Sequence, residues 1–216
     1  MKRISEYAAF EYEEVDKMLV SELVDYLDVN VKKVYEFFDI SCNQNKPVIR
    51  IIPTKKEFDN CFKFAWDFEA DNSSRGFYKN GVITYLSIHD YKNTTHAFEK
   101  DYYLGALDDY KKTLVHEFVH YVNELFNVIN NCGPTIKFLR EGIAIYLSGQ
   151  KENKSIKLSN SLEDLLDVNK NYYDEYYLLT KYLITNYDKR FVFELFKSNR
   201  KAKEFLKEEL YEKVKE

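Results

Sequence analysis

The sequence predicts a predominantly helical α+β fold, and three observations lead to this prediction. Only six glycines and three prolines occur among 216 residues, which favours long helices joined by short loops. Strand-like runs are confined to the first half of the chain, and the last third has a helical pattern almost throughout. We therefore expect a small sheet with antiparallel strands at its edge, followed by an all-helical second half.

The expected elements of the first half begin with an amphipathic helix over residues 15–38, where apolar side chains recur at intervals of three and four. The β-branched run 48–52 predicts a strand, and Pro53 separates it from a helical pattern that reaches Trp66. Between residues 76 and 89 the pair Asn80-Gly81 joins two strand-like runs, which is a strong hairpin signal. We expect this hairpin to leave one strand edge exposed.

The expected elements of the second half follow a stretch without clear period, 91–107, which is predicted to be a surface loop. Asp108 or Asp109 is the expected cap of a helix that ends near residue 130, and Thr135 is the expected cap of the next one. Further helices are predicted over residues 161–168, 172–187, 190–196 and 202–214. We expect a single domain over residues 1–216, with a strand-containing lobe over 1–130 and a helical lobe over 131–216.

Composition and charge exclude several classes of protein. Apolar residues make up 45% of the chain, which is enough for a sizeable core. The formal charge of −4 argues against a nucleic-acid partner and against a basic membrane-binding face. The sequence contains no run of about 18 apolar residues, so no membrane-spanning helix is predicted. Its three cysteines lack a CxxC spacing, which favours a reducing compartment. We therefore expect a soluble cytoplasmic protein, whose oligomeric state the sequence leaves open.

Residues 116–120, His-Glu-Phe-Val-His, match the HExxH motif inside a helical pattern. His116 and His120 are one helical turn apart and about 40° apart around the axis, so both imidazoles can reach one metal ion. Glu117 projects to one side, where its carboxylate can accept a proton from a water molecule on the metal. The motif therefore predicts a catalytic zinc site.

A catalytic zinc ion usually takes three protein ligands, so the two histidines need a partner. The metzincin spacing is absent, because Asn123 stands where its glycine should be and no histidine follows His120. Glu141 is the best candidate, because it lies 21 positions after His120, beyond a Gly-Pro break and inside a second predicted helix. The other candidates are His89, His96 and Glu124.

Two motifs together resemble those of the gluzincin metallopeptidases, in which HExxH is followed on a second helix by a glutamate ligand, often in a Glu-Gly-x-Ala setting. The motifs in this chain are HEFVH and Leu139-Arg140-Glu141-Gly142-Ile143-Ala144-Ile145-Tyr146. The likeness extends more weakly over residues 13–200. It implies a thermolysin-like minimal metallopeptidase, with the small sheet packed on the HExxH helix and a helical lobe that carries the glutamate ligand.

The resemblance implies a role for each site residue. His116, His120 and Glu141 would bind one zinc ion, and Glu117 would activate water for hydrolysis of a peptide or protein substrate. A downstream tyrosine would stabilise the oxyanion, and Tyr173 or Tyr177, which share a helix face, is preferred to Tyr172 or Tyr176 on the neighbouring face. By analogy, a strand over residues 82–88 would align an extended substrate at the sheet edge.

Two departures from the family pattern change what the resemblance implies. Ile145 stands where thermolysin-like members carry an aspartate that orients a zinc-bound histidine, so this support must come from elsewhere. The Gly-Ala-Met-Glu-Asn stretch that anchors a substrate's free amine in related aminopeptidases is absent before His116, which favours endopeptidase action. Two alternatives remain: a noncatalytic interaction protein that keeps the fold as a scaffold, and a toxin or effector enzyme with a host-specific substrate.

Overall fold

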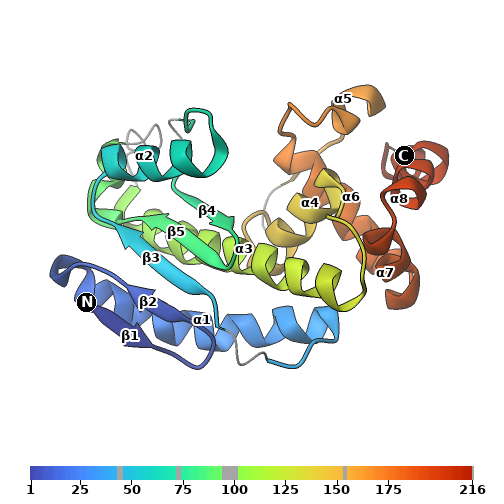
Figure 1. Ribbon diagram of the computed structural model, residues 1–216. Helices are drawn as coiled ribbons and strands as arrows, with labels where there is room; N and C mark the ends of the chain where they lie inside the picture. The colour runs from blue at the N-terminus through green and yellow to red at the C-terminus, as the bar shows by residue number, and fades with distance from the viewer. Residues whose placement is uncertain (43–45, 72–73, 94–101, 153–154, 216) are drawn as a thin grey trace. The chain divides into compact units, whose positions relative to one another are not determined.

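The computed structural model describes residues 1–42, 46–71, 74–93, 102–152 and 155–215 (Figure 1). The fold is α+β and predominantly helical, which confirms the prediction at this level. Two compact units are present, Met1–Tyr121 and Val122–Glu216, and the division falls within one long helix. Among the described residues, none of the helices has the length and apolar character needed to cross a membrane. The single-domain organisation stays a prediction.

The first unit contains a mixed sheet whose strands run side by side in the order β1-β2-β3-β5-β4 (Figure 1). β3 is parallel to both of its neighbours, whereas β1 and β4 are antiparallel to theirs. The predicted sheet with antiparallel edges is therefore confirmed. Its strands are β1 (Lys2–Ile4), β2 (Ala9–Glu11), β3 (Val48–Ile52), β4 (Gly76–Lys79) and β5 (Val82–Leu86).

The predicted hairpin joins β4 to β5. Lys79 pairs with Val82, and Asn80 and Gly81 have φ angles of 51° and 79°, as a two-residue type I′ turn requires. β5 also pairs with β3, so the expectation that residues 82–88 offer a free edge is wrong, and β4 is the edge strand. The sequence does not show which strand of a hairpin joins the rest of the sheet.

The N-terminal strands β1 and β2 were not expected from the sequence. Each has three residues, Lys-Arg-Ile and Ala-Phe-Glu, and this is too short for an alternating apolar pattern to stand out. Phe10 in β2 is fully buried, so this one side chain carries most of the strand's burial.

Two helices of the first unit, α2 (Lys55–Trp66) and α3 (Tyr102–Ile129), lie against β4, and the Thr54 side chain caps α2. The other helices of this unit are α1 (Lys17–Phe38) and the short 3-10 helices η1 (Glu14–Asp16) and η2 (Ile88–Asn93). The Phe77 ring contacts Phe58 and Phe62 of α2, whereas the Tyr78 ring contacts Tyr121 of α3. Because successive side chains of a strand point to opposite faces, α2 and α3 lie on opposite sides of β4. The predicted packing of the sheet on the HExxH helix is confirmed within this unit.

Helix α3 begins at Tyr102, so the expected cap at Asp108 or Asp109 is wrong. Tyr110 is fully buried and continues the apolar stripe toward the N-terminus of the helix. In the sequence, the two aspartates before Tyr110 interrupt this apolar pattern, so the earlier start of the helix is hard to predict. These aspartates form ion pairs instead, Asp109 with Arg75 and Asp108 with Lys112. The predicted loop 91–107 is therefore partly helix, and residues 94–101, which include His96, lie outside the described residues.

In the second unit, the regular secondary structure of the described residues is entirely helical, as predicted. Residues 202–214, expected as one helix, are divided by a π-helical stretch, η4. The elements that follow α3 are α4 (Lys137–Ser148), α5 (Leu162–Leu166), α6 (Tyr173–Asn186), α7 (Lys189–Lys197), α8 (Asn199–Phe205), η4 (Leu206–Leu210) and α9 (Tyr211–Lys215).

Helices α4 and α6 approach each other closely at Gly142. A β-carbon built on Gly142 would lie 2.0 Å from Thr180 Oγ1 and 2.4 Å from the backbone oxygen of Tyr176. Only glycine therefore lets the two helix backbones lie this near. The glycine directly follows Glu141, so this contact also fixes the place of the predicted ligand on α4.

The substitution Gly142→Ala should lower the free energy of unfolding by about 1–3 kcal/mol or more, because the new methyl group has to displace the α6 backbone. Urea unfolding of the purified variant measures this loss. Gly133→Ala is the matched control, because a β-carbon at Gly133 meets nothing within 4 Å. Equal midpoints for the two variants would contradict the close approach of α4 and α6.

Candidate metal centre

The HExxH residues lie on α3 where that helix is buried on several sides. Leu114, Val115, Phe118 and Val119 are fully buried and hold this part of the helix in the core. His116 is buried along with them, whereas His120 is half-buried. The helix is thus positioned by its apolar neighbours, and the two imidazoles need little reorganisation to act together.

The two imidazoles converge on each other. Their Nε2 atoms lie 3.1 Å apart, and the ring planes are nearly perpendicular at 88°. Two ligand atoms bound to one tetrahedral zinc ion at about 2.0–2.1 Å are separated by about 3.3 Å. The spacing of the two nitrogens therefore fits shared coordination of one ion, with almost no movement of either ring.

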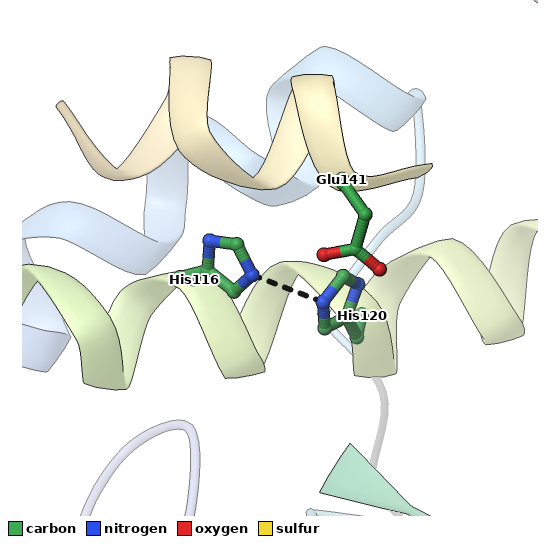
Figure 2. A group of neighbouring side chains, drawn as sticks. All are labelled: His116, His120 and Glu141. Atoms are coloured by element: carbon green, nitrogen blue, oxygen red, sulfur yellow. Dashed lines mark hydrogen bonds between the residues drawn. The ribbon is translucent and has the colours of Figure 1, made fainter. Parts of the chain in front are cut away.

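Glu141 on α4 completes the group (Figure 2). One ligand atom each from His116, His120 and Glu141 lies within 4.8 Å of the others, and Glu141 is buried. Two imidazole nitrogens and a carboxylate oxygen are a donor set that zinc and other divalent transition metals accept. These three residues can therefore hold a metal ion, as the sequence predicts.

The other described candidates for a third ligand lie outside this group. His89 is on η2, its side chain is 55% exposed, and its Nε2 lies 3.9 Å from Asp16 Oδ1. Glu124 lies further along α3 and is exposed. Neither residue belongs to the metal-binding group, so the choice of Glu141 from the sequence agrees with the structure.

The carboxylate of Glu141 receives two hydrogen bonds from its neighbour in sequence. Arg140 Nε and Nη2 donate to the same oxygen, Oε1, at 3.1 and 2.9 Å. The pKa of Tyr176 on α6 is raised, first because the residue is buried and then because of the negative charge of Glu141. No role of Arg140 is predicted from the sequence, although it stands inside the motif, and Tyr176 is predicted only as a less favoured oxyanion donor.

Glu117 is buried beside the edge strand of the sheet. A β-carbon built on Gly76 of β4 would lie 3.3 Å from Glu117 Cγ and 2.6 Å from the Tyr85 ring. Tyr85 is held in turn by a hydrogen bond from its hydroxyl to the Tyr110 backbone oxygen, 2.6 Å long. Glycine at position 76 therefore makes room for the predicted general base, a role the sequence did not indicate.

Polar side chains of α3 hold the turn that leads into α4. Thr135 does not cap α4, whose N-cap is Ile136 without a side-chain bond, so that expectation is wrong. Instead, the Thr135 hydroxyl accepts a bond from Asn123 Nδ2 at 3.1 Å and donates to Asn127 Oδ1 at 3.2 Å. Asn123 and Thr135 are buried, so these bonds fix where α4 begins and hence the path of the chain to Glu141.

The structure places the two predicted oxyanion tyrosines in different surroundings. Tyr177 is buried, and its ring lies 6.4 Å from that of Tyr146. Tyr173, the first residue of α6, is 43% exposed. Their catalytic roles stay predictions.

Saturating zinc should raise the thermal midpoint of unfolding, because the ion binds only the folded chain. At a hundredfold excess over the dissociation constant, the gain is about 2.7 kcal/mol, or about 5–10 °C. His116→Ala and Glu141→Ala should abolish the shift, whereas His89→Ala should keep it. Differential scanning calorimetry with and without zinc measures the effect, and equal shifts in all four proteins would contradict the assignment.

The substitution Gly76→Ala should destabilise the protein by about 1–3 kcal/mol, since its methyl group meets the Tyr85 ring and the Glu117 side chain. Chemical denaturation gives the loss, and Gly133→Ala again serves as the neutral control. A Gly76→Ala protein as stable as the wild type would show that neither side chain lies against this strand.

Comparisons with models of protein families, with curated proteins and with solved structures give no match. A group of two histidines and a glutamate does not by itself assign a chain to a family.

Proposed function

We propose that this chain is a zinc-dependent peptidase of gluzincin type that cleaves within peptide chains. The observation that carries the proposal is the convergence of His116 and His120, one turn apart on α3, with Glu141 of α4. This ligand set leaves one position of a tetrahedral ion for water, which distinguishes catalytic from structural zinc sites. The proposal includes the thermolysin-like arrangement, and zinc as the ion.

Glu117 supplies the proton transfer in this proposal. When bound, zinc lowers the pKa of a water molecule toward about 7 and polarises the carbonyl of the scissile bond. Glu117 would accept a proton from the water as its oxygen bonds to the carbonyl carbon, and would then donate that proton to the amide nitrogen, so that the C–N bond breaks and a carboxylic acid and an amine leave. Glu117 is buried and does not belong to the metal-binding group, so in this proposal it acts on the water without being a ligand.

The edge strand β4 offers a place for an extended substrate. In the hairpin register, Lys79 and Phe77 bond to β5, so the backbone groups of Gly76 and Tyr78 point to the open edge of the sheet. A peptide that pairs with this edge runs past Gly76, whose position beside Glu117 supports the assignment of substrate to β4. Of the two predicted oxyanion donors, Tyr173 is the more exposed residue, which favours it for contact with a substrate.

The substitution Glu117→Gln should lower the rate of peptide cleavage about 10²- to 10⁴-fold while the zinc content stays unchanged. Cleavage of a peptide library, followed by mass spectrometry, and metal analysis of the same samples measure the two quantities. Glu124→Gln is the matched control, because Glu124 lies on the same helix and is exposed.

The noncatalytic alternative gives a different result. A wild-type protein that holds about one zinc ion and cuts no peptide, or a Glu117→Gln variant that cuts as fast as the wild type, would identify the site as a metal-binding scaffold.

A further inference from the structure

We propose that Arg140 is a positioning residue that restricts Glu141 to coordination through a single oxygen, and so preserves the metal's open position. The inference rests on the proposed function, because it concerns the same site. The inference goes beyond the proposed function, because it assigns a role to a side chain that is neither a ligand nor a proton carrier.

The geometry of the pair supports this task. Arg140 directs two N–H groups, Nε and Nη2, at one carboxylate oxygen, Oε1, at 3.1 and 2.9 Å. A carboxylate oxygen has about two lone pairs, so two charge-assisted bonds occupy Oε1 fully. The oxygen that Glu141 presents to a metal ion is then Oε2.

The number of oxygens matters because of the coordination number. Two histidines and one carboxylate oxygen fill three positions of a tetrahedral ion and leave the fourth for water. If both oxygens of Glu141 were to bind, the second would occupy or crowd that position. Arg140 thus favours the ligand arrangement that hydrolysis requires.

The inference concerns the two directed hydrogen bonds of Arg140, the arginine fork, and not its positive charge alone, because Lys137 also supplies a positive charge nearby. Lys137 lies one turn earlier on α4, and its ammonium group donates to the backbone oxygens of Val168 and Lys170, each at 2.7 Å. Burial lowers the pKa of Lys137, whereas the negative charge of Glu141 raises it. Lys137 therefore acts on Glu141 through its charge, while Arg140 also makes directed bonds.

The position of Arg140 makes the test practical. Its side chain is 42% exposed, whereas that of Glu141 is 10% exposed, so replacing the arginine leaves no cavity in the core. Arg140→Gln removes both the fork and the charge, and Arg140→Lys keeps the charge but loses the fork. Lys137→Gln is the control for charge, and circular dichroism confirms that each variant is folded.

Cobalt(II) is the probe, because its visible absorption is strong with four ligands and weaker with five. Wild-type protein and Lys137→Gln should show the strong four-coordinate bands. Arg140→Gln and Arg140→Lys should both lose that intensity, as the second oxygen of Glu141 enters the coordination shell. The inference would be overturned if Arg140→Gln kept the wild-type spectrum. It would also be overturned if Arg140→Lys kept the wild-type bands, because the charge alone would then be sufficient.

The spectra separate this inference from the proposed function. Unchanged spectra of the arginine variants, together with peptide cleavage by the wild type, overturn the role of Arg140 alone. The expected spectral loss without any cleavage by the wild type supports the role of Arg140 and overturns the peptidase proposal. A wild-type protein that binds no cobalt and no zinc overturns both.

Discussion

One turn of helix α3 separates His116 from His120, and the 3.1 Å between their Nε2 atoms is the constraint on which the candidate site depends. Residues one turn apart on a helix share a face, so this spacing lets one helix present two imidazoles to one ion. Every other feature of the site adds to that pair: a carboxylate from α4, a second carboxylate at the next position of α3, and a strand edge beside it. The fully buried Val115 and Phe118 keep the helix in place.

Two glycines make the close approaches that the site requires. Gly76 lets the edge strand lie against Tyr85 and Glu117, and Gly142 lets α4 lie against α6 directly after Glu141. At both positions a methyl group would displace a packed neighbour by a large part of its own size. The proposed proton carrier, Glu117, and the proposed ligand, Glu141, thus each lie beside a glycine that permits close packing.

Much of the fold and the metal-binding group could be predicted from the sequence, because both depend on local patterns. The stripe of α1, the run Val48–Ile52 and the Asn80-Gly81 turn each have a period or turn chemistry that is visible in isolation. The ligands follow from helical spacing and from the position of Glu141 on the next helix. The membership of Glu141 in the group could therefore be predicted from the sequence.

The features that the sequence did not predict depend on contacts between distant residues. The short strands β1 and β2 are defined by their pairing partners, and the order β3-β5-β4 decides that β4 is the edge. The role of Thr135 depends on its hydrogen bonds with Asn123 and Asn127. No helix or turn pattern in the sequence indicates that these asparagines contact Thr135. The bonds from Arg140 to Glu141 join neighbours in sequence, yet only the rotamers of the two side chains reveal them.

The most direct test of the central claim is the position of the ion itself. A crystal of the zinc-loaded protein, measured on both sides of the zinc absorption edge, gives an anomalous difference map in which zinc alone stands out. The account predicts one peak, about 2.0–2.2 Å from His116 Nε2, His120 Nε2 and one oxygen of Glu141. A zinc peak elsewhere, or three side chains that point away from one another in that crystal, would contradict it.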